Sequence, residues 1–369
     1  MKNFLLALFF ISAFGLCSSA QTDTPYVAGF RASRILSSYP GNTFPNDNYW
    51  TYVGNEMAAK FDSTGTAAIW IVSLYQSAGV TRLNFPSPGG TYPNITFGST
   101  DQNEAYLDRF DQEGFKVWLQ VEPGEANVDT LIKLVTDRYK HHPCVAGFGV
   151  DVEWLNSENY SGGQHVTDSM AQSWEIYLHS IDTSYVLFLK HYSYNWMPPT
   201  YRGKILFVDD SQGFTSLNQM KNEFVLWGNH FPANNVAFQF GYKADSTWWK
   251  QYADPPLTIG TTLRSNIPNC YGLFWVDFTI CQIFDISVRT DDVLYDSEIT
   301  VVFNSESKCA EITGTEEGFQ YRLTDSAGKI ISSGIMVRSL FLGEFESGIY
   351  FLQIFNHKTS RTFKILNYR

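Results

Sequence analysis

The feature of this sequence that most constrains its fold is a regular alternation of short apolar, β-rich runs with amphipathic stretches between residues 26 and 288. The β-rich runs are Tyr26–Ala32, Ala67–Val72, Lys116–Val121, Val145–Val152, Tyr185–Lys190, Lys204–Val208, Asn235–Phe240 and Tyr271–Val276. The stretches with helical periodicity include Asn103–Glu113, Asn127–Tyr139, Asp168–His179 and Ser216–Asn229. Strands that alternate with helices in this way over roughly 260 residues are typical of an α/β fold of the (β/α)8 TIM-barrel type.

A doubly wound parallel sheet is the alternative for such an alternation. That fold binds its ligand at a glycine-rich turn after the first strand, and Gly29-Phe30-Arg31-Ala32 is not such a turn. The interval after the first run is long, and Thr81–Phe85 has the composition of an inserted hairpin strand. The sequence therefore favours the barrel, spanning residues 21–295.

The sequence pattern changes after about Asp296, where helical periodicity stops and short alternating strands with glycine turns follow. The runs are Ile299–Phe303, Ala310–Thr313, Phe319–Thr324, Lys329–Ser333, Gly348–Ile354 and Arg361–Leu366. Short strands without intervening helices predict a small all-β sandwich over residues 296–369.

The N-terminus has the pattern of a removable secretory signal peptide over residues 1–20. Lys2 supplies a positive charge, Phe4–Leu16 is mostly apolar, and the small residues Ser18–Ala20 precede an expected cleavage after Ala20. The apolar run is too short for a membrane anchor, so we expect a secreted or surface protein with no membrane span in the mature chain. Cys17 opens a lipoprotein alternative, but Leu16 is bulkier than the small residue that such a site needs.

Composition excludes several functional classes. A net charge of −11 argues against nucleic acid as a partner, whereas 16% aromatic residues suit a protein that stacks on sugar rings. The sequence holds no C-x-x-C pair, H-E-x-x-H helix motif, EF-hand loop or G-x-S-x-G elbow, so we expect neither a metal nor another cofactor. A Cys270–Cys281 disulfide stays open.

The strongest candidate for chemistry is the end of the fourth β-rich run. Active sites of (β/α)8 barrels form at the C-terminal ends of the strands. Side chains alternate along a strand, so Asp151 and Glu153 are expected to point into the same opening. Two carboxyl groups this close resist ionising together, and one pKa should rise enough to make a proton donor near neutral pH. The alternative is that both acids only bind backbone amides of a loop.

Other polar residues follow the remaining runs. Glu122 lies at the end of the third run. It is a candidate for the second carboxylate of a two-acid mechanism or for a ligand of a sugar hydroxyl, and the alternative is that it only caps the following turn. Of the adjacent Asp209 and Asp210 after the sixth run, one must point inward, and Asp209 does so if Phe207 shares the inner face. The other candidates for substrate binding are Gln239 and Tyr242 at the seventh run and Trp275 and Asp277, which end the eighth run and are expected to share one face.

The fourth run also resembles the D-x-D-x-E signature of family-18 glycoside hydrolases, reading Gly149-x-Asp151-x-Glu153 here. The resemblance implies that Glu153 is the general acid and that Asp151 orients a substrate N-acetyl group that acts as internal nucleophile. It also implies that a sixth-strand aspartate, Asp209, contacts substrate and that Trp275 forms the floor of a sugar subsite. The sequence departs from the signature at Gly149, where an acid is missing.

The tail resembles the C-terminal sorting domain of type IX secretion cargo. The ordered landmarks are Tyr321–Asp325, Gly328–Ile331, Leu342, Ser347–Leu352 and Phe363–Ile365. The resemblance implies a partner, the type IX secretion machinery, and export through periplasm and outer membrane of a Bacteroidetes-type bacterium. A generic β-sandwich, such as a sugar-binding module, is the alternative.

Two functions follow from these patterns. The first is a secreted glycoside hydrolase that acts on a polysaccharide or oligosaccharide substrate with Glu153 as acid. The second is a catalytically inactive, lectin-like barrel, which the missing acid at Gly149 favours.

Overall fold

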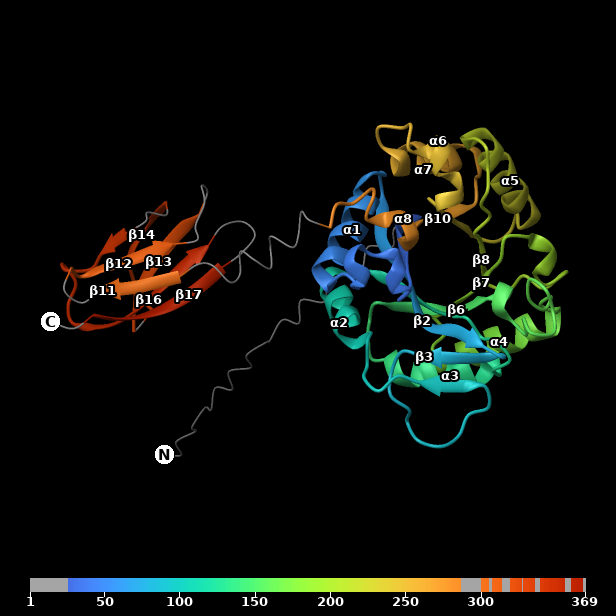
Figure 1. Ribbon diagram of the computed structural model, residues 1–369, viewed down its shortest axis with the longest axis horizontal. Coiled ribbons are helices and arrows are strands. Elements are labelled where there is room, and N and C mark those ends of the chain that lie inside the picture. The colour runs from blue at the N-terminus through green and yellow to red at the C-terminus, as the bar shows by residue number, and fades with distance from the viewer. Residues whose placement is uncertain are drawn as a thin grey trace, which may run out of the picture. The chain divides into compact units, whose positions relative to one another are not determined.

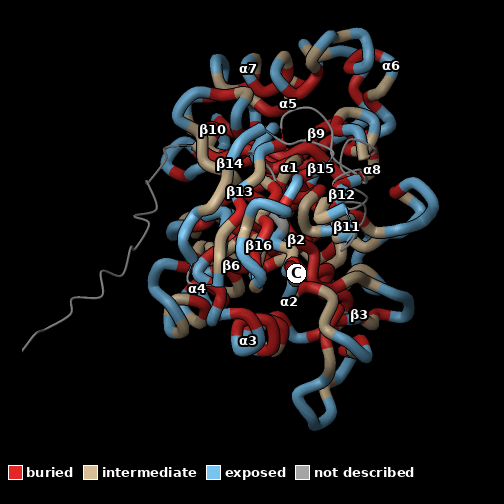
Figure 2. The backbone as a smooth tube through the Cα atoms, turned by 90° about the vertical axis from the view of Figure 1, so that its left-hand side faces the viewer, coloured by how far each residue is buried: buried red, intermediate tan, exposed pale blue. Residues whose placement is uncertain are grey.

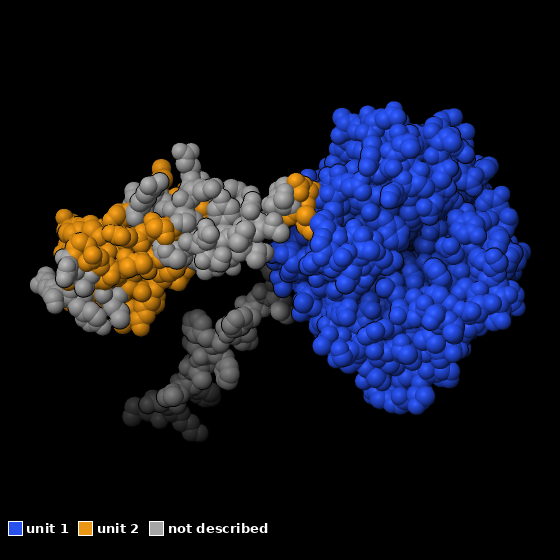
Figure 3. Space-filling view, in the orientation of Figure 1, with its two compact units in different colours: residues 1–284 blue, residues 285–369 orange. Residues whose placement is uncertain are grey.

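The computed structural model describes residues 26–286 and, further along, residues 300–304, 307–313, 319–326, 328–335, 339–355 and 360–367. The chain divides into two compact units, residues 1–284 and residues 285–369 (Figure 3). The predicted signal peptide and the predicted boundary near residue 295 lie outside the described residues.

The first unit is a closed barrel of parallel strands surrounded by helices (Figure 1). Its strands are β1 (Tyr26–Ala32), β2 (Thr64–Ser77), β5 (Lys116–Val121), β6 (Val145–Asp151), β7 (Val186–Lys190), β8 (Leu206–Asp209), β9 (Val236–Phe240) and β10 (Cys270–Val276). Because β1 pairs with both β2 and β10, the barrel has no free edge. The predicted (β/α)8 barrel is confirmed.

Strand β2 continues beyond the barrel wall into a small extension, in which β2 and β3 are antiparallel and β3 and β4 are parallel. Its C-terminal part pairs with β3 (Val80–Leu83), which pairs in turn with β4 (Ile95–Phe97). The hairpin strand predicted at Thr81–Phe85 is therefore confirmed.

Five of the longer helices begin at residues whose side chains cap the first turn. The longer helices are α1 (Asp47–Ala59), α2 (Glu104–Glu113), α3 (Val128–Tyr139), α4 (Asp168–Ile181), α5 (Leu217–His230) and α7 (Pro255–Asn266), with short α6 (Ser246–Trp249) and α8 (Asp277–Ile280). The side chains of Asn46, Asn127, Thr167, Ser216 and Asp254 each accept a hydrogen bond from a backbone N–H of the following helix. Among the described residues, no helix combines the length and apolar character needed to cross a membrane.

Strand register decides which side chains enter the barrel. Gln120 pairs with Gly149, Gly149 with Phe188, and Asp151 with Lys190. Because neighbours in register on parallel strands point to the same side, these residues all face inward. The lower interior is an apolar core that includes Trp118, and Figure 2 shows the barrel strands as buried.

The second unit consists of two antiparallel sheets. One contains β11 (Thr300–Asn304), β12 (Cys309–Thr313) and β15 (Ser339–Phe341). The other contains β13 (Gln320–Asp325), β14 (Ile330–Ile335), β16 (Gly348–Phe355) and β17 (Ser360–Asn367). Side chains from both sheets, such as Ile312 and Leu352, share one apolar core. The predicted all-β sandwich is confirmed.

Candidate active site

A buried ion-pair network lies at the mouth of the barrel, by which we mean the C-terminal ends of its strands. Lys190 ends β7, and its Nζ lies 2.9 Å from Asp151 Oδ2 and 2.5 Å from Asp210 Oδ2. Gln120 Nε2 donates to the same Asp151 oxygen at 3.1 Å. Asp151, Lys190 and Asp210 are only 2%, 3% and 5% exposed. We call Gln120, Asp151, Lys190 and Asp210 the lysine cluster.

The surroundings of the lysine cluster raise the pKa values of both Lys190 and Asp151. Burial opposes charge on Lys190, but Asp151 and Asp210 outweigh it and raise the pKa of the lysine. Burial also raises the pKa of Asp151, and the attraction of Lys190 opposes that rise while Asp210 and Glu122 add to it. The cluster therefore keeps its ammonium charged while Asp151 ionises less readily than an exposed aspartate.

Several polar atoms of the mouth are buried without a hydrogen-bond partner in the described part of the chain. They are Gln120 Oε1, Asp151 Oδ1, Asp210 Oδ1 and Gln239 Nε2. Tyr242 Oη lies 3.4 Å from Asp210 Oδ2 and 3.5 Å from Gln239 Oε1. Buried polar atoms in native proteins normally have partners, so this set is placed to bind a ligand rich in hydroxyl or amide groups.

Glu153 is close enough to this network for the charges of Lys190 and Asp210 to act on it. It lies in a single 3₁₀ turn, Val152–Trp154, that follows β6. Its side chain is half-buried, and no other described residue forms a hydrogen bond with its carboxyl group. Burial raises its pKa, Lys190 opposes the rise, and Asp210 adds to it. Glu153 is thus a carboxylic acid with a raised pKa and an unengaged head group.

Glu122 is the second acid at the mouth with a raised pKa. It follows β5, is 9% exposed, and its Oε2 accepts a hydrogen bond of 2.8 Å from the backbone N–H of Tyr75. Burial raises its pKa to about 7, although that hydrogen bond and the positive charge of Arg31 lower it. The charges of Glu122, Glu153 and Asp210 all act on Asp151, so the structure brings these four acids into one electrostatic environment.

Asp277 is engaged by protein groups. Its carboxylate accepts hydrogen bonds from Arg31 Nη1 at 2.7 Å, from Ser33 N at 2.6 Å and Oγ at 2.7 Å, and from Tyr39 Oη at 2.7 Å. A carboxylate with this many hydrogen bonds ties the end of β1 and the residues that follow it to the end of β10. The structure gives it a role in holding the barrel closed.

The expectation that Asp209 faces the mouth is wrong. Asp209 pairs in register with Phe238, and its strand neighbour Phe207 stacks on Phe231 with ring centroids 3.9 Å apart. Phe207 and Asp209 therefore point to the helices, while Val208 and Asp210 point inward. The inner face carries Asp210 because the inward-facing Lys190 pairs in register with Val208, which lies two residues before Asp210.

The expectation that Trp275 forms a subsite floor is also wrong. Its ring is fully buried against Gly241, packs edge-on against Trp249, and donates its Nε1–H to Thr279 Oγ1 at 2.9 Å. The predicted shared face with Asp277 fails because β10 ends at Val276 and helix α8 begins at Asp277, which ends the strand alternation.

Gly149, at the position where the D-x-D-x-E pattern would have its first acid, has a packing reason to be glycine. A Cβ atom at Gly149 would lie 2.0 Å from Cε1 and Cζ of the Phe188 ring. Phe188 fills the barrel centre at that level, so no side chain fits there.

Sequence reasoning missed Lys190, Gln120 and Arg31. Lys190 ends a predicted strand and follows Val-Leu-Phe-Leu, and a charged residue at that position is the signal that would have identified it. Of the four described cysteines, Cys144, Cys270, Cys281 and Cys309, none forms a disulfide.

Comparison with known proteins adds little beyond the fold. No family model matches the sequence, and no curated protein matches it. Similar solved structures include an FMN-binding β-glucuronidase from Facaelibacterium prausnitzii L2-6, with 10% identity and a TM-score of 0.41 over 94% of this chain and 57% of that one. A putative β-galactosidase from Bacteroides fragilis has 10% identity and a TM-score of 0.39 over 93% and 55%. A modular endo-β-1,4-mannanase from Cellulomonas fimi, of glycoside hydrolase family 26, has 11% identity and a TM-score of 0.40 over 93% and 94%.

The chain spans little more than half the length of the first two of these proteins. Structural similarity at this level says nothing about activity. The function proposed below is therefore argued from the residues of the mouth.

Proposed function

We propose that this protein is a glycoside hydrolase that cleaves a polysaccharide at the mouth of the barrel, with Glu153 as general acid. The observation that carries the proposal is the state of Glu153: half-buried, with a raised pKa and no hydrogen-bond partner among the described residues. A carboxyl group that holds its proton more tightly than an exposed glutamic acid, and that is free to reach a ligand, suits the protonation of a glycosidic oxygen.

The lysine cluster and the neighbouring Gln239 support the same assignment because they offer fixed polar groups to a polyhydroxylated substrate. Asp151 Oδ1, Asp210 Oδ1 and Gln239 Nε2 are buried polar atoms that can accept from or donate to hydroxyl or N-acetyl groups. Asp151 is held by Gln120 and Lys190, so its remaining oxygen has a defined direction. In this proposal Asp151 orients the substrate, and Glu122 or Asp210 is the carboxyl group that acts together with the general acid Glu153.

The direct test is hydrolysis by the Glu153→Gln variant. The purified chain is incubated with a panel of polysaccharides, and new reducing ends are measured. The wild type should cleave at least one glycan, and Glu153→Gln should lose about 10²–10⁴-fold of that rate because the acid is gone. Glu56→Gln, at an exposed position of α1, is the matched control and should cleave normally. Normal cleavage by a folded Glu153→Gln protein would remove the assignment.

A second candidate function is glycan binding without hydrolysis. The observation that favours it is Lys190, whose ammonium pairs with both Asp151 and Asp210 and so occupies two of the carboxylates. Retention of the wild-type protein on an immobilised glycan, with no reducing ends released from any member of the panel, would support this function over hydrolysis.

We also propose that the C-terminal unit directs export by type IX secretion and that residues 1–20 are a signal peptide. Landmarks of the sorting-domain resemblance, among them Leu323, Leu342 and Leu352, lie in the core of the β-sandwich, so the motif residues support one folded unit. Fusion of residues 296–369 to a periplasmic reporter in a bacterium with this pathway tests the proposal. Reporter that stays in the periplasm would refute it.

A further inference from the structure

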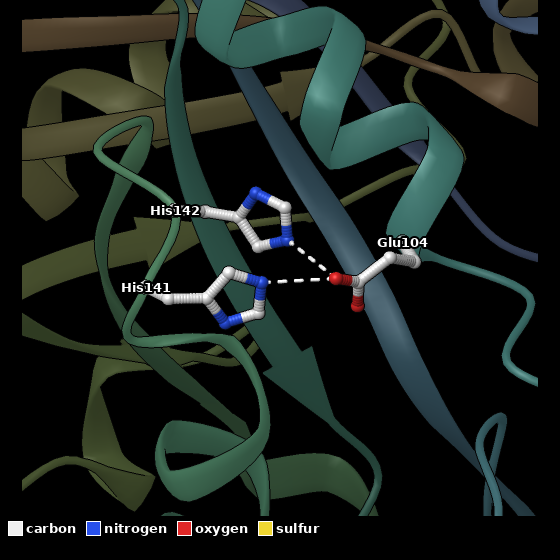
Figure 4. A group of neighbouring side chains, drawn as sticks. All are labelled: Glu104, His141 and His142. Carbon is white, nitrogen blue, oxygen red and sulfur yellow. Dashed lines mark hydrogen bonds and ion pairs between the residues drawn. The ribbon is translucent and has the colours of Figure 1, made fainter.

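Two adjacent histidines and a glutamate from another element converge at a point outside the mouth. His141 and His142 lie in the loop between α3 and β6, and Glu104 is the first residue of α2 (Figure 4). Both imidazole rings point toward the Glu104 carboxylate in Figure 4. The histidine loop lies at the N-terminal end of β6, and Asp151 lies at its C-terminal end. A strand of seven residues therefore separates the histidines from the mouth by about 20 Å. We call Glu104, His141 and His142 the histidine cluster.

The spacing of the ligand atoms fits a small cation. Glu104 Oε1 lies 2.9 Å from His141 Nε2 and 3.6 Å from His142 Nε2, and all three atoms lie within 4.8 Å of one another. Ligands about 2.0–2.2 Å from a tetrahedral zinc ion are about 3.3 Å from each other. The two distances bracket that value, so a zinc ion fits with small side-chain movements.

The second observation concerns His142, which is 2% exposed. Its Nε2 is buried and has no hydrogen-bond partner within the described residues, and it faces Glu104 at a distance too long for a hydrogen bond. Glu104 Oε2 is likewise buried without a partner. A buried imidazole nitrogen that faces a carboxylate without bonding it is the arrangement expected where a cation completes the contact.

The other side of the His142 ring is fixed as in metal sites. His142 Nδ1 lies 2.7 Å from Asp111 Oδ2, and Asp111 Oδ1 accepts a hydrogen bond of 2.8 Å from the backbone N–H of Cys144. A carboxylate that accepts the Nδ1 proton leaves the lone pair of a neutral imidazole on Nε2. Metal-binding histidines have this outer partner in most known sites, because it sets the tautomer and orients the ring.

We propose that the histidine cluster binds one zinc ion through His141 Nε2, His142 Nε2 and a Glu104 carboxylate oxygen, with Asp111 as the positioning residue. Two imidazoles and one carboxylate are a ligand set that suits zinc. His141 and Glu104 are partly exposed, which leaves a fourth position for water. The ion joins the start of α2 to the loop before β6, and so stabilises the barrel wall independently of the proposed hydrolase activity.

The test is zinc binding by the full chain without an affinity tag. Protein stripped with chelator is titrated with zinc sulfate against a fluorescent zinc indicator, and its melting temperature is measured at each zinc concentration. We expect one zinc ion per chain and a melting temperature that rises with zinc. His141→Ala and Glu104→Gln, both at partly exposed positions, should abolish this binding, while His165→Ala, an exposed histidine on another loop, should bind like the wild type.

Two further variants locate the ion. Asp111→Asn should weaken zinc binding about 10–100-fold, because it loses the carboxylate that orients His142. Asp108→Asn should leave binding unchanged, since Asp108 lies 4.0 Å from Nδ1, on the other side of the ring. The proposal is overturned if the wild type binds no zinc, if His141→Ala and Glu104→Gln bind it normally, or if only Asp108→Asn loses it.

Discussion

Replacement of Lys190 by methionine tests whether the ion pairs at the mouth are as buried as the structure shows. Methionine has a similar length but no charge, so Asp151 and Asp210 lose the ammonium that lies 2.9 and 2.5 Å from them. Removal of one partner from a buried ion pair costs about 3–5 kcal/mol. That loss is a large fraction of the about 5–15 kcal/mol by which a domain is stable.

The loss should depend on pH in a defined direction. Burial raises the pKa of Asp151 in the folded chain, and without the opposing charge of Lys190 that pKa rises further above its value of about 4 in the unfolded chain. Between those values the folded state binds more protons than the unfolded state, so the free energy of unfolding falls as pH rises, by about 1.4 kcal/mol per pH unit for each proton. The variant should therefore be closest to the wild type near pH 4 and furthest from it near pH 8.

Urea unfolding at about pH 5 and about pH 8, followed by tryptophan fluorescence, measures both effects. Lys133→Met is the matched control, because Lys133 pairs with Asp137 at 2.5 Å but on the exposed surface of α3. Surface pairs contribute little to stability, so the control should unfold like the wild type at both pH values. If Lys190→Met and Lys133→Met behaved alike, or if the Lys190→Met deficit did not grow with pH, the reasoning would be refuted.

Two further predictions concern the barrel interior and mouth. Gly149→Ala should cost about 1–3 kcal/mol of unfolding free energy by overpacking against Phe188, and Phe188→Leu should restore part of it in the double variant; simple additivity would contradict this contact. Glu122 has a folded pKa of about 7, above its unfolded value, so its stabilising contribution is present at low pH and is lost as pH rises from about 4.5 through 7. Glu122→Gln should flatten that decline in urea unfolding, and an unchanged slope would be evidence against the shift.

Much of the fold was predictable because the burial of strands and helices requires apolar residues at regular positions in the sequence. Runs such as Lys116–Val121 and Tyr26–Ala32 match strand bounds, since strands buried on both sides read as continuous apolar segments. Asn127 and Ser216, at the starts of predicted helices, cap them. Asp151 was predictable as an inward residue because it follows Gly149 by two positions within one regular strand.

What the sequence by itself determined is the set of elements, their order and the acids at the strand ends. It could not determine which of Asp209 and Asp210 faces inward, because that depends on the register of β8 against β7 and not on composition. It marks Lys190 only as a charged residue at the end of an apolar strand, and it could not show the ion pairs of that lysine with Asp151 and Asp210, which come from neighbouring strands. Local periodicity is encoded in consecutive residues, whereas ion pairs across strands form only when the barrel closes.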